Sequence, residues 1–191
     1  MRTSIGELVY ITKRFYREKK QKIHVEDMCQ LSELLTEQKY KSSYERIGKV
    51  LRKHVTNLGL DTIKYFRLVL FCFLTGNNDM HLKNFSLMHT DKGILLSPAY
   101  DLLNINLIFP SDKEDLALTL NGKKKRIKRL DFDKFAENLK ISEQVRNNIY
   151  KDFSAQIHEM DNWIEKSFLT KEFKKRYSEI IIDKFERLDL Y

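Results

Sequence analysis

The sequence has few of the residues that build disulfide frameworks, zinc sites and linkers. Its two cysteines, Cys29 and Cys72, lie far apart in apolar helical contexts, which predicts reduced core thiols rather than a disulfide or a redox pair. Two cysteines and five scattered histidines give no zinc signature. Pro98 and Pro110 are the only prolines, and no Pro/Gly-rich linker, repeat or low-complexity tract is present. We therefore expect one globular domain over residues 1–191.

Long hydrophobic runs and clustered glycines are also missing. No apolar segment approaches the roughly 20 residues that span a bilayer, and the N-terminal sequence MRTSIGELVY lacks the layout of a signal peptide. We expect a cytoplasmic protein without membrane association. The six glycines stand at positions 6, 48, 59, 76, 93 and 122, and no two are close enough to cradle a phosphate.

Positive charge is in excess, at a formal net charge of +8, which favours anionic partners such as nucleotides, RNA or DNA. It is concentrated in KKKRIKR (123–129) and KEFKKRY (171–177). Clusters of this kind without a DNA-reading motif do not specify sequence readout. Two interpretations stay open for them: a solvated face or mobile loop, or nonspecific attraction to nucleic acid.

Hydrophobic periodicity predicts a helix-dominated α+β chain. A strand pattern at about 7–15 is followed by expected helices near 25–36, 43–57 and 61–75. The run FSLMHTDKGILLSPAYD then predicts two short strands around a turn at 90–93. Irregular chain is expected from there to about residue 130.

Three helices are expected to close the sequence. FDKFAENL is short, and the second helix, 142–168, carries an apolar stripe at steps of three and four residues: Val145, Ile149, Phe153, Ile157, Met160, Ile164 and Phe168. The third repeats that spacing with Phe173, Tyr177, Ile181, Phe185 and Leu188. Stripes of this kind are more often core than binding surface, so we expect these helices to pack beneath the site described next.

The segment TGNNDMHLKNFS (75–86) carries the strongest chemical signal. Asp79 lies five residues before Asn84, after an apolar helical segment that Gly76 can end, and Asp101 follows the predicted hairpin, which would bring it back beside Asn84. Phosphoryl transfer needs a carboxylate to orient the attacking hydroxyl, an amide oxygen on a magnesium ion and a second carboxylate for the metal. The Asp-x-x-x-x-Asn interval is that of the protein-kinase signature. The interval alone is weak, because an aspartate and an asparagine five residues apart occur by chance in many loops. Asp79 can also be an Asx-turn residue that caps the loop.

These residues carry a resemblance to a known family. The runs NNDMHLKNFSL and LLSPAYDLLN resemble the C-terminal part of the HipA-like serine/threonine kinases, the toxin half of bacterial toxin–antitoxin pairs. VYITKRFYR (9–17) resembles the family's hinge strand, VEDMCQLSE (25–33) its next helix, and LALTLNGKKK (116–125) a segment after the second aspartate. The matches cover roughly residues 5–125. The resemblance implies an α+β, predominantly helical lobe like the C-terminal lobe of HipA and protein kinases, with a short N-terminal strand and a small β-hairpin.

The resemblance also implies roles for the loop residues. Asp79 would be the catalytic base, and Asn84 and Asp101 would be ligands of Mg²⁺. His81 and Lys83 would lie near the phosphates of ATP, where a lysine can stabilise transferring negative charge. Simpler interpretations stay open, since His81 can be a loop hydrogen-bonder and Lys83 a solvated charge.

Further upstream, Lys13, Arg14 and Phe15 would line the adenine side of the nucleotide by the same resemblance. Lys13 and Arg14 can also be edge-strand charges that discourage aggregation. The family often has Asp where this chain has Tyr16, which changes the contacts expected near the ribose.

Two functions are compatible with this pattern. In the first, the chain is the C-terminal catalytic lobe of an ATP-dependent serine/threonine kinase whose nucleotide lobe, with its glycine-rich loop and phosphate-pairing lysine, comes from an upstream segment or a separate HipA-N-like chain. In the second, it is a noncatalytic regulatory module that binds a partner or nucleic acid. The partners implied are a protein substrate, a HipB-like antitoxin and, through the basic clusters, nucleic acid.

Overall fold

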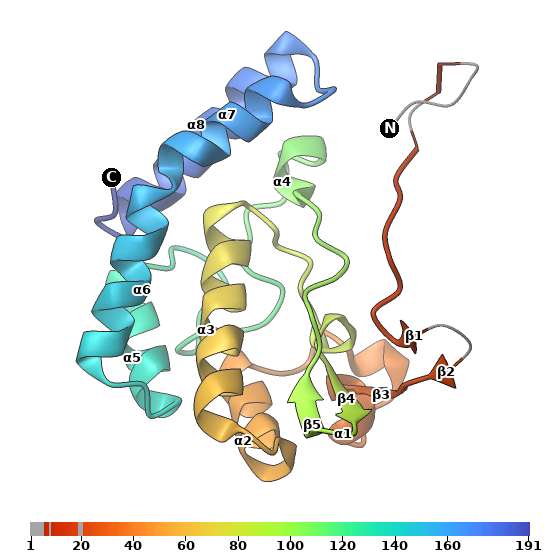
Figure 1. Ribbon diagram of the computed structural model, residues 1–191. Coiled ribbons are helices and arrows are strands. Elements are labelled where there is room, and N and C mark those ends of the chain that lie inside the picture. The colour runs from red at the N-terminus through yellow and green to blue at the C-terminus, as the bar shows by residue number, and fades with distance from the viewer. Residues whose placement is uncertain (1–5, 8, 19–20) are drawn as a thin grey trace.

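The structure, a computed structural model, describes residues 6–7, 9–18 and 21–191 and has a predominantly helical α+β fold (Figure 1). Its strands are β1 (Arg17–Glu18), β2 (Gln21–Lys22), β3 (His24–Asp27), β4 (Ser86–Thr90) and β5 (Gly93–Leu96). Its α-helices are α1 (Met28–Leu31), α2 (Tyr44–His54), α3 (Leu58–Leu74), α4 (Ile105–Ile108), α5 (Arg129–Asn138), α6 (Glu143–Ala155), α7 (Ile157–Lys166) and α8 (Lys171–Arg187). Two 3₁₀ turns, η1 (Thr36–Gln38) and η2 (Leu82–Asn84), complete the elements.

A three-stranded antiparallel sheet in the order β3-β4-β5 lies beside the central helix α3 (Figure 1). The hairpin of β4 and β5 confirms the prediction from the sequence, and its turn uses Gly93 at φ +106°. The third strand was not predicted. β3 pairs along its whole length with β4, which places His24 opposite His89 and Asp27 opposite Ser86.

The helix expected over 25–36 is wrong in its extent. Asp27 accepts a hydrogen bond from the backbone N–H of Gln30, whose side chain caps the N–H of Asp27 in return, so helix α1 begins only after the strand. Glu33, at φ +56°, ends it within four residues, and the N–H of Leu34 bonds to the carbonyl of Cys29 at 3.0 Å.

The N-terminal strand expected at about 7–15 is also misplaced. Within the described part of that range the chain is irregular, and the first short strands are β1 and β2. Val9, Tyr10 and Ile11 are exposed. A strand needs the backbone of a neighbour, and the described part of the chain supplies none to this segment.

The C-terminal helices follow the predicted apolar stripes with one change. The single helix expected over 142–168 is two helices, α6 and α7, interrupted at Gln156. Gln156 keeps a nearly helical backbone, φ −96° and ψ −1°, but its N–H bonds to the carbonyl of Phe153 in a tighter turn. Most stripe residues are buried or pack against the core, whereas Phe168 and Phe173 are exposed.

The core is built around aromatic side chains on α2, α3 and α5. Tyr44, Tyr65, Phe85 and Phe135 are buried and meet edge to face, with ring centroids 5.4–6.5 Å apart. Cys29 and Cys72 are buried and unpaired. Among the described residues, no helix is both long and apolar enough to cross a membrane.

Candidate functional site

The loop that carries Asp79 begins at a well-defined helix end. Gly76, at φ +70°, stops α3 as predicted, and the N–H of Asn77 bonds to the carbonyl of Cys72 at 2.8 Å, the hydrogen bond of a Schellman cap. A Cβ on residue 76 would lie 2.9 Å from Nδ2 of Asn104. Glycine is required here both by the backbone angle and by the close approach.

Buried tyrosines hold the underside of this loop. The hydroxyl of Tyr44 donates to the carbonyl of Met80 at 3.0 Å, and the hydroxyl of Tyr65 donates to the carbonyl of Tyr44 at 2.9 Å. Met80 and Leu82 are fully buried. The polar face of the loop is therefore presented from a rigid apolar base, as the sequence predicts.

Asp79 is half-buried, and its side chain has a fixed partner. The hydroxyl of Tyr40 donates to Oδ1 of Asp79 at 2.8 Å. Burial and this carboxylate raise the pKa of Tyr40 to about 12, so the hydroxyl stays protonated and remains a donor. The Asx turn of the loop belongs to Asn77, whose Oδ1 accepts the N–H of Asp79 at 3.3 Å. The carboxylate of Asp79 is thus not needed for the turn.

The structure brings Asn84 and Asp101 together. Nδ2 of Asn84 donates to Oδ2 of Asp101 at 2.5 Å. Asn84 is buried at the end of η2, whereas Asp101 is exposed and has a left-handed backbone, φ +56°. Such angles are uncommon outside glycine and concentrate at functional sites.

His81 belongs to the same loop, two residues after Asp79. It is buried, its ring meets that of Tyr40 at 5.0 Å in a T-shaped contact, and its Nδ1 has no hydrogen-bond partner within the described chain. Burial, and then the charge of Lys39, lower its pKa even though the carboxylates of Asp79 and Asp101 both act in the opposite direction. The imidazole is therefore neutral at neutral pH, within electrostatic reach of both aspartates.

Lys83 points to a partner outside the loop. Its Nζ lies 3.0 Å from Oδ2 of Asp27, the residue that caps α1, and this hydrogen bond raises the pKa of Lys83. Lys83 is therefore a paired cation rather than a freely solvated charge. Tyr100 donates its hydroxyl to the Lys83 carbonyl at 2.6 Å, which ties the residue before Asp101 to the loop.

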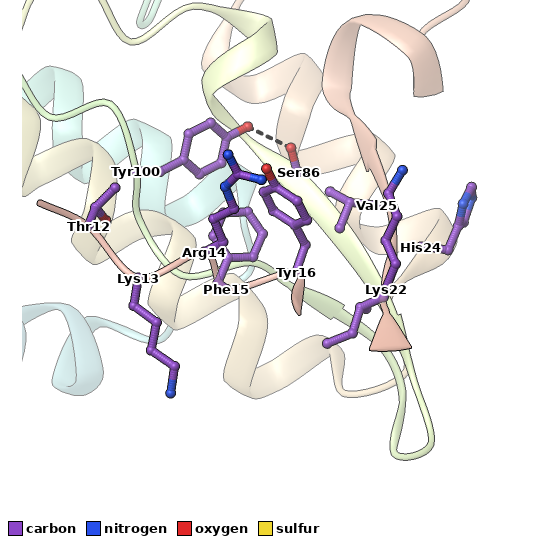
Figure 2. A pocket seen from close by; sticks show the side chains of 11 residues that line it. Thr12, Lys13, Arg14, Phe15, Tyr16, Lys22, His24, Val25, Ser86 and Tyr100 are labelled. Carbon is purple, nitrogen blue, oxygen red and sulfur yellow. Dashed lines mark hydrogen bonds between the residues drawn. The ribbon is translucent and has the colours of Figure 1, made fainter. Parts of the chain in front are cut away.

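A cavity of about 770 Å³ adjoins the site (Figure 2). Phe15, Tyr16 and Tyr100 gather on one side of it, and Phe15 stacks on Tyr100 with ring centroids 5.3 Å apart. Lys13 and Arg14 also line it. Because the described residues before Phe15 form no strand, the interpretation of these two cations as edge-strand charges is wrong.

The oxygen-rich pair fits a hard divalent cation. Oδ1 of Asn84 is buried without a hydrogen-bond partner in the described chain, and the carboxylate of Asp101 lies against the same amide. Amide and carboxylate oxygens are the ligands that magnesium takes from proteins. The residues present are therefore compatible with a magnesium site at Asn84 and Asp101.

Three residues with defined contacts in the site had no role assigned from the sequence: Asp27, Tyr40 and Tyr100. Asp27 has a local signal, because it stands three residues before Gln30 in a capping pattern. Tyr40 and Tyr100 have none, since their partners in the site lie far away in the chain. Burial raises the pKa of Tyr100 to about 12, so its hydroxyl remains a donor.

Part of the first basic cluster is paired within the protein. Lys123 lies 2.8 Å from Asp131, and Lys124 lies 3.4 Å from Glu114. Arg129 packs over the ring of Tyr150 and donates to the carbonyl of Leu188 at 2.8 Å. Three cations of this segment are exposed and have no ion pair within the described residues: Lys125, Arg126 and Lys128.

Comparison with known proteins identifies the family of the chain. A family model described as the HipA-like C-terminal domain matches residues 1–161, and the chain belongs to this family. Y4dM of Sinorhizobium fredii, described as a candidate kinase, is 36% identical over 137 residues, or 69% of this chain and 32% of the relative. A candidate kinase of Haemophilus influenzae is 29% identical over 109 residues, or 52% of this chain and 32% of the relative. The chain thus spans about a third of the length of these relatives.

A solved structure shows the same fold. A chain from the complex of the Shewanella oneidensis MR-1 toxin–antitoxin proteins HipA and HipB with operator DNA superposes with a TM-score of 0.73 at 21% identity. The match covers 92% of this chain and 47% of that one. The α+β arrangement is therefore that of a HipA-like C-terminal lobe.

Proposed function

We propose that this chain is the C-terminal catalytic lobe of an ATP-dependent serine/threonine protein kinase. The observation that carries the proposal is the contact of Asn84 with Asp101 beside the loop that holds Asp79. Family membership and similarity to candidate kinases support it. A role as the toxin of a toxin–antitoxin pair, with a HipB-like antitoxin as partner, rests on the solved relative.

In the proposed reaction, the hydroxyl oxygen of a substrate serine or threonine attacks the γ-phosphorus of ATP. The bond from that phosphorus to the bridging oxygen breaks, and ADP leaves. Asp79 orients the hydroxyl and accepts its proton. Tyr40 fixes Oδ1 of Asp79, and in the described part of the chain the other carboxylate oxygen accepts no hydrogen bond, so it is available to the substrate.

Asn84 and Asp101 would hold magnesium, which when bound neutralises charge on the nucleotide phosphates. Asn84 is buried and its Nδ2 faces Asp101, so ligation of one ion by both residues would require the amide to turn until Oδ1 faces the carboxylate. His81, being neutral, adds no repulsion toward a cation at this point. Lys83 keeps its charge and would act near the phosphates once they compete with Asp27 for its ammonium group.

The nucleotide base would enter the cavity beside Tyr100. Phe15 and Tyr100 offer aromatic faces for stacking, and Lys13 and Arg14 offer positive charge to an anionic ligand. A volume of about 770 Å³ lies in the range of small-molecule sites. Exposed Val9, Tyr10 and Ile11 lead into this region and are suited to contact a nucleotide lobe.

A second function, a noncatalytic module that binds a partner or nucleic acid, is supported by the exposed cations Lys125, Arg126 and Lys128. They line a cavity of about 460 Å³ together with Lys113 and Arg187. Nonspecific binding of phosphates needs no more than such a surface. An assay of phosphate transfer from ATP distinguishes the two functions, because only the catalytic lobe takes part in that reaction.

The test is an ATP phosphotransfer assay on the purified chain, alone and mixed with or joined to the nucleotide lobe of a family member. We expect the chain alone to unfold cooperatively, because it closes a hydrophobic core from Met28 to Leu190. We expect it to transfer little phosphate, since no glycine-rich loop lies within residues 1–191 and lost positioning forfeits on the order of 7–11 kcal/mol.

The outcomes separate the alternatives. Activity that appears only on addition of the lobe supports the proposal. Robust phosphorylation by the chain alone contradicts the need for a separate lobe. Transfer that stays absent with the lobe, while nucleic acid or antitoxin binds, supports the noncatalytic module.

A further inference from the structure

A second group of ligand-type side chains lies on the small sheet, apart from Asn84 and Asp101. His24 on β3 stands directly opposite His89 on β4, and their rings are 4.7 Å apart. Glu26 follows His24 by two residues, so its side chain leaves the same face of the strand. The pairing of β3 with β4 therefore fixes all three side chains on one surface.

The three side chains converge on one point. Nε2 of His89 lies 3.0 Å and Nε2 of His24 lies 3.4 Å from the same oxygen, Oε2 of Glu26. One ligand atom from each residue lies within 4.8 Å of the other two. Neighbouring ligand atoms in a tetrahedral site with bonds of about 2.0–2.1 Å are separated by about 3.3 Å. The two distances to Glu26 are close to this value, and the histidine ligand atoms lie within 4.8 Å of each other.

We propose that His24, Glu26 and His89 form a binding site for a divalent transition-metal ion of the zinc class. Two imidazole nitrogens with one carboxylate oxygen suit Zn²⁺ and its neighbours, whereas magnesium takes oxygen ligands. Three protein ligands leave a fourth position for water or another ligand, as in open zinc sites. Sequence spacing does not reveal the site, because the two histidines are brought together only by strand pairing.

The position of this cluster on the sheet determines what a bound ion would do to the structure. Residues on both sides of it connect to the loop of Asp79: Asp27, next to Glu26, pairs with Lys83, and β4 begins at Ser86, shortly after Asn84. His24 also lines the larger cavity, on the side remote from Tyr100 (Figure 2). A bound ion would fasten β3 to β4 at the outer rim of that cavity. This inference does not depend on phosphoryl transfer.

The metal-free arrangement has its own explanation, in which the imidazole of His89 donates Nε2–H to the carboxylate of Glu26 and the imidazole of His24 lies 3.4 Å from the same oxygen. Metal binding instead needs the lone pair of each Nε2, with the proton on Nδ1. If the cluster is only hydrogen-bonded, the protein binds no Zn²⁺. If it is a metal site, the protein binds Zn²⁺ and the affinity depends on both histidines.

The experiment uses protein without a histidine tag, freed of metal by a chelator and titrated with Zn²⁺ in competition with a chromophoric chelator. We expect one ion per chain. His89→Gln and Glu26→Gln should each weaken binding by more than the roughly 10–100-fold that follows loss of an outer-shell partner. His158→Gln, at an exposed position of helix α7, is the matched control and should bind like the parent.

Two further measurements keep the test independent of variant folding. In the parent protein, Zn²⁺ should shift the ring resonances of His24 and His89 and leave those of His158 unchanged. Co²⁺ in place of Zn²⁺ should give the intense visible absorption of a four- or five-coordinate site. Absence of Zn²⁺ binding, unchanged affinity in His89→Gln, or equal loss in His158→Gln would each overturn the proposal and leave a hydrogen-bonded surface cluster.

Discussion

Nδ2 of Asn84 and Oδ2 of Asp101 are 2.5 Å apart although 17 residues separate them in the chain. The β4–β5 hairpin turns the chain back so that Asp101 follows Tyr100, which is itself bonded to the carbonyl of Lys83. Asp101 keeps a left-handed backbone at this point, a conformation that costs of order 1–3 kcal/mol outside glycine. Oδ1 of Asn84, the other atom of this amide, is buried and has no hydrogen-bond partner in the described chain.

The role proposed for Asp101 predicts a specific result for Asp101→Gly in the chain assembled with a nucleotide lobe. Glycine suits the observed φ of +56°, so this change removes the carboxylate without adding backbone strain. We expect the magnesium concentration for half-maximal turnover to rise at least tenfold, on the order of metal-site losses. The measurement is ATP turnover against magnesium concentration. Asp91→Gly, in the exposed hairpin turn, is the control, and an equal rise in both variants would contradict the metal site.

Asp79→Asn should separate chemistry from binding in the same assembly. Loss of a general base lowers the turnover number by roughly 10²–10⁴-fold, while the nucleotide dissociation constant should stay near that of the parent. Tyr40→Phe removes only the hydrogen bond to Oδ1 and should give a smaller decrease. Stopped turnover assays and nucleotide titrations measure the two quantities. Full activity of Asp79→Asn would exclude Asp79 as the base.

Asp115 should control the acid stability of the fold. Burial alone would raise its pKa, but hydrogen bonds from Arg187 and Lys184 outweigh burial and bring it to about 2. An aspartate in an unfolded chain has a pKa of about 3.9. Because the folded value is the lower one, this carboxylate stabilises the fold fully above about pH 4, and the contribution is lost as the pH falls from there through about 2.

The measurement is urea unfolding of parent, Asp115→Asn and Asp183→Asn at several pH values. At neutral pH, Asp115→Asn should lose roughly 3–5 kcal/mol, since Lys184 and Arg187 are left near the core without their carboxylate. Asp183 pairs with the same Arg187 at 3.6 Å but is exposed, so its loss should cost about 1 kcal/mol or less. If the free energy of unfolding of Asp115→Asn fell between pH 4 and 2 as steeply as that of the parent, the acid sensitivity of the fold would not come from Asp115.

The basic segment should divide into nucleic-acid-binding and structural cations. If the segment binds duplex DNA, joint replacement of Lys125, Arg126 and Lys128 by Ala should flatten the dependence of log affinity on log salt by about 0.9 for each phosphate that the variant no longer neutralises. Lys123→Ala should instead lower stability, because its partner Asp131 is buried. Fluorescence anisotropy over a salt series and thermal unfolding measure the two effects. Absence of binding at low salt would leave a solvated surface.

Local chemistry in the sequence determined much of the site. The interval from Asp79 to Asn84, the end of α3 at Gly76 and the β4–β5 hairpin all depend on short-range turn and helix-capping preferences. The apolar stripes of α6 to α8 could also be predicted, because a 3.6-residue period is visible in the sequence without knowledge of the packing partner. The break between α6 and α7 at Gln156 could not be predicted, since no proline or glycine marks it.

Only the tertiary structure decided which distant groups meet. Residues 24–27 form a strand rather than a helix because β4, some sixty residues later, offers its backbone, whereas the exposed segment before Phe15 remains irregular for lack of such a neighbour. The partners of Asp79, Lys83 and Lys123 are likewise remote in sequence. Sequence periodicity fixes which face of an element is apolar. Which side chains touch is set by how the elements pack, and that depends on the whole chain at once.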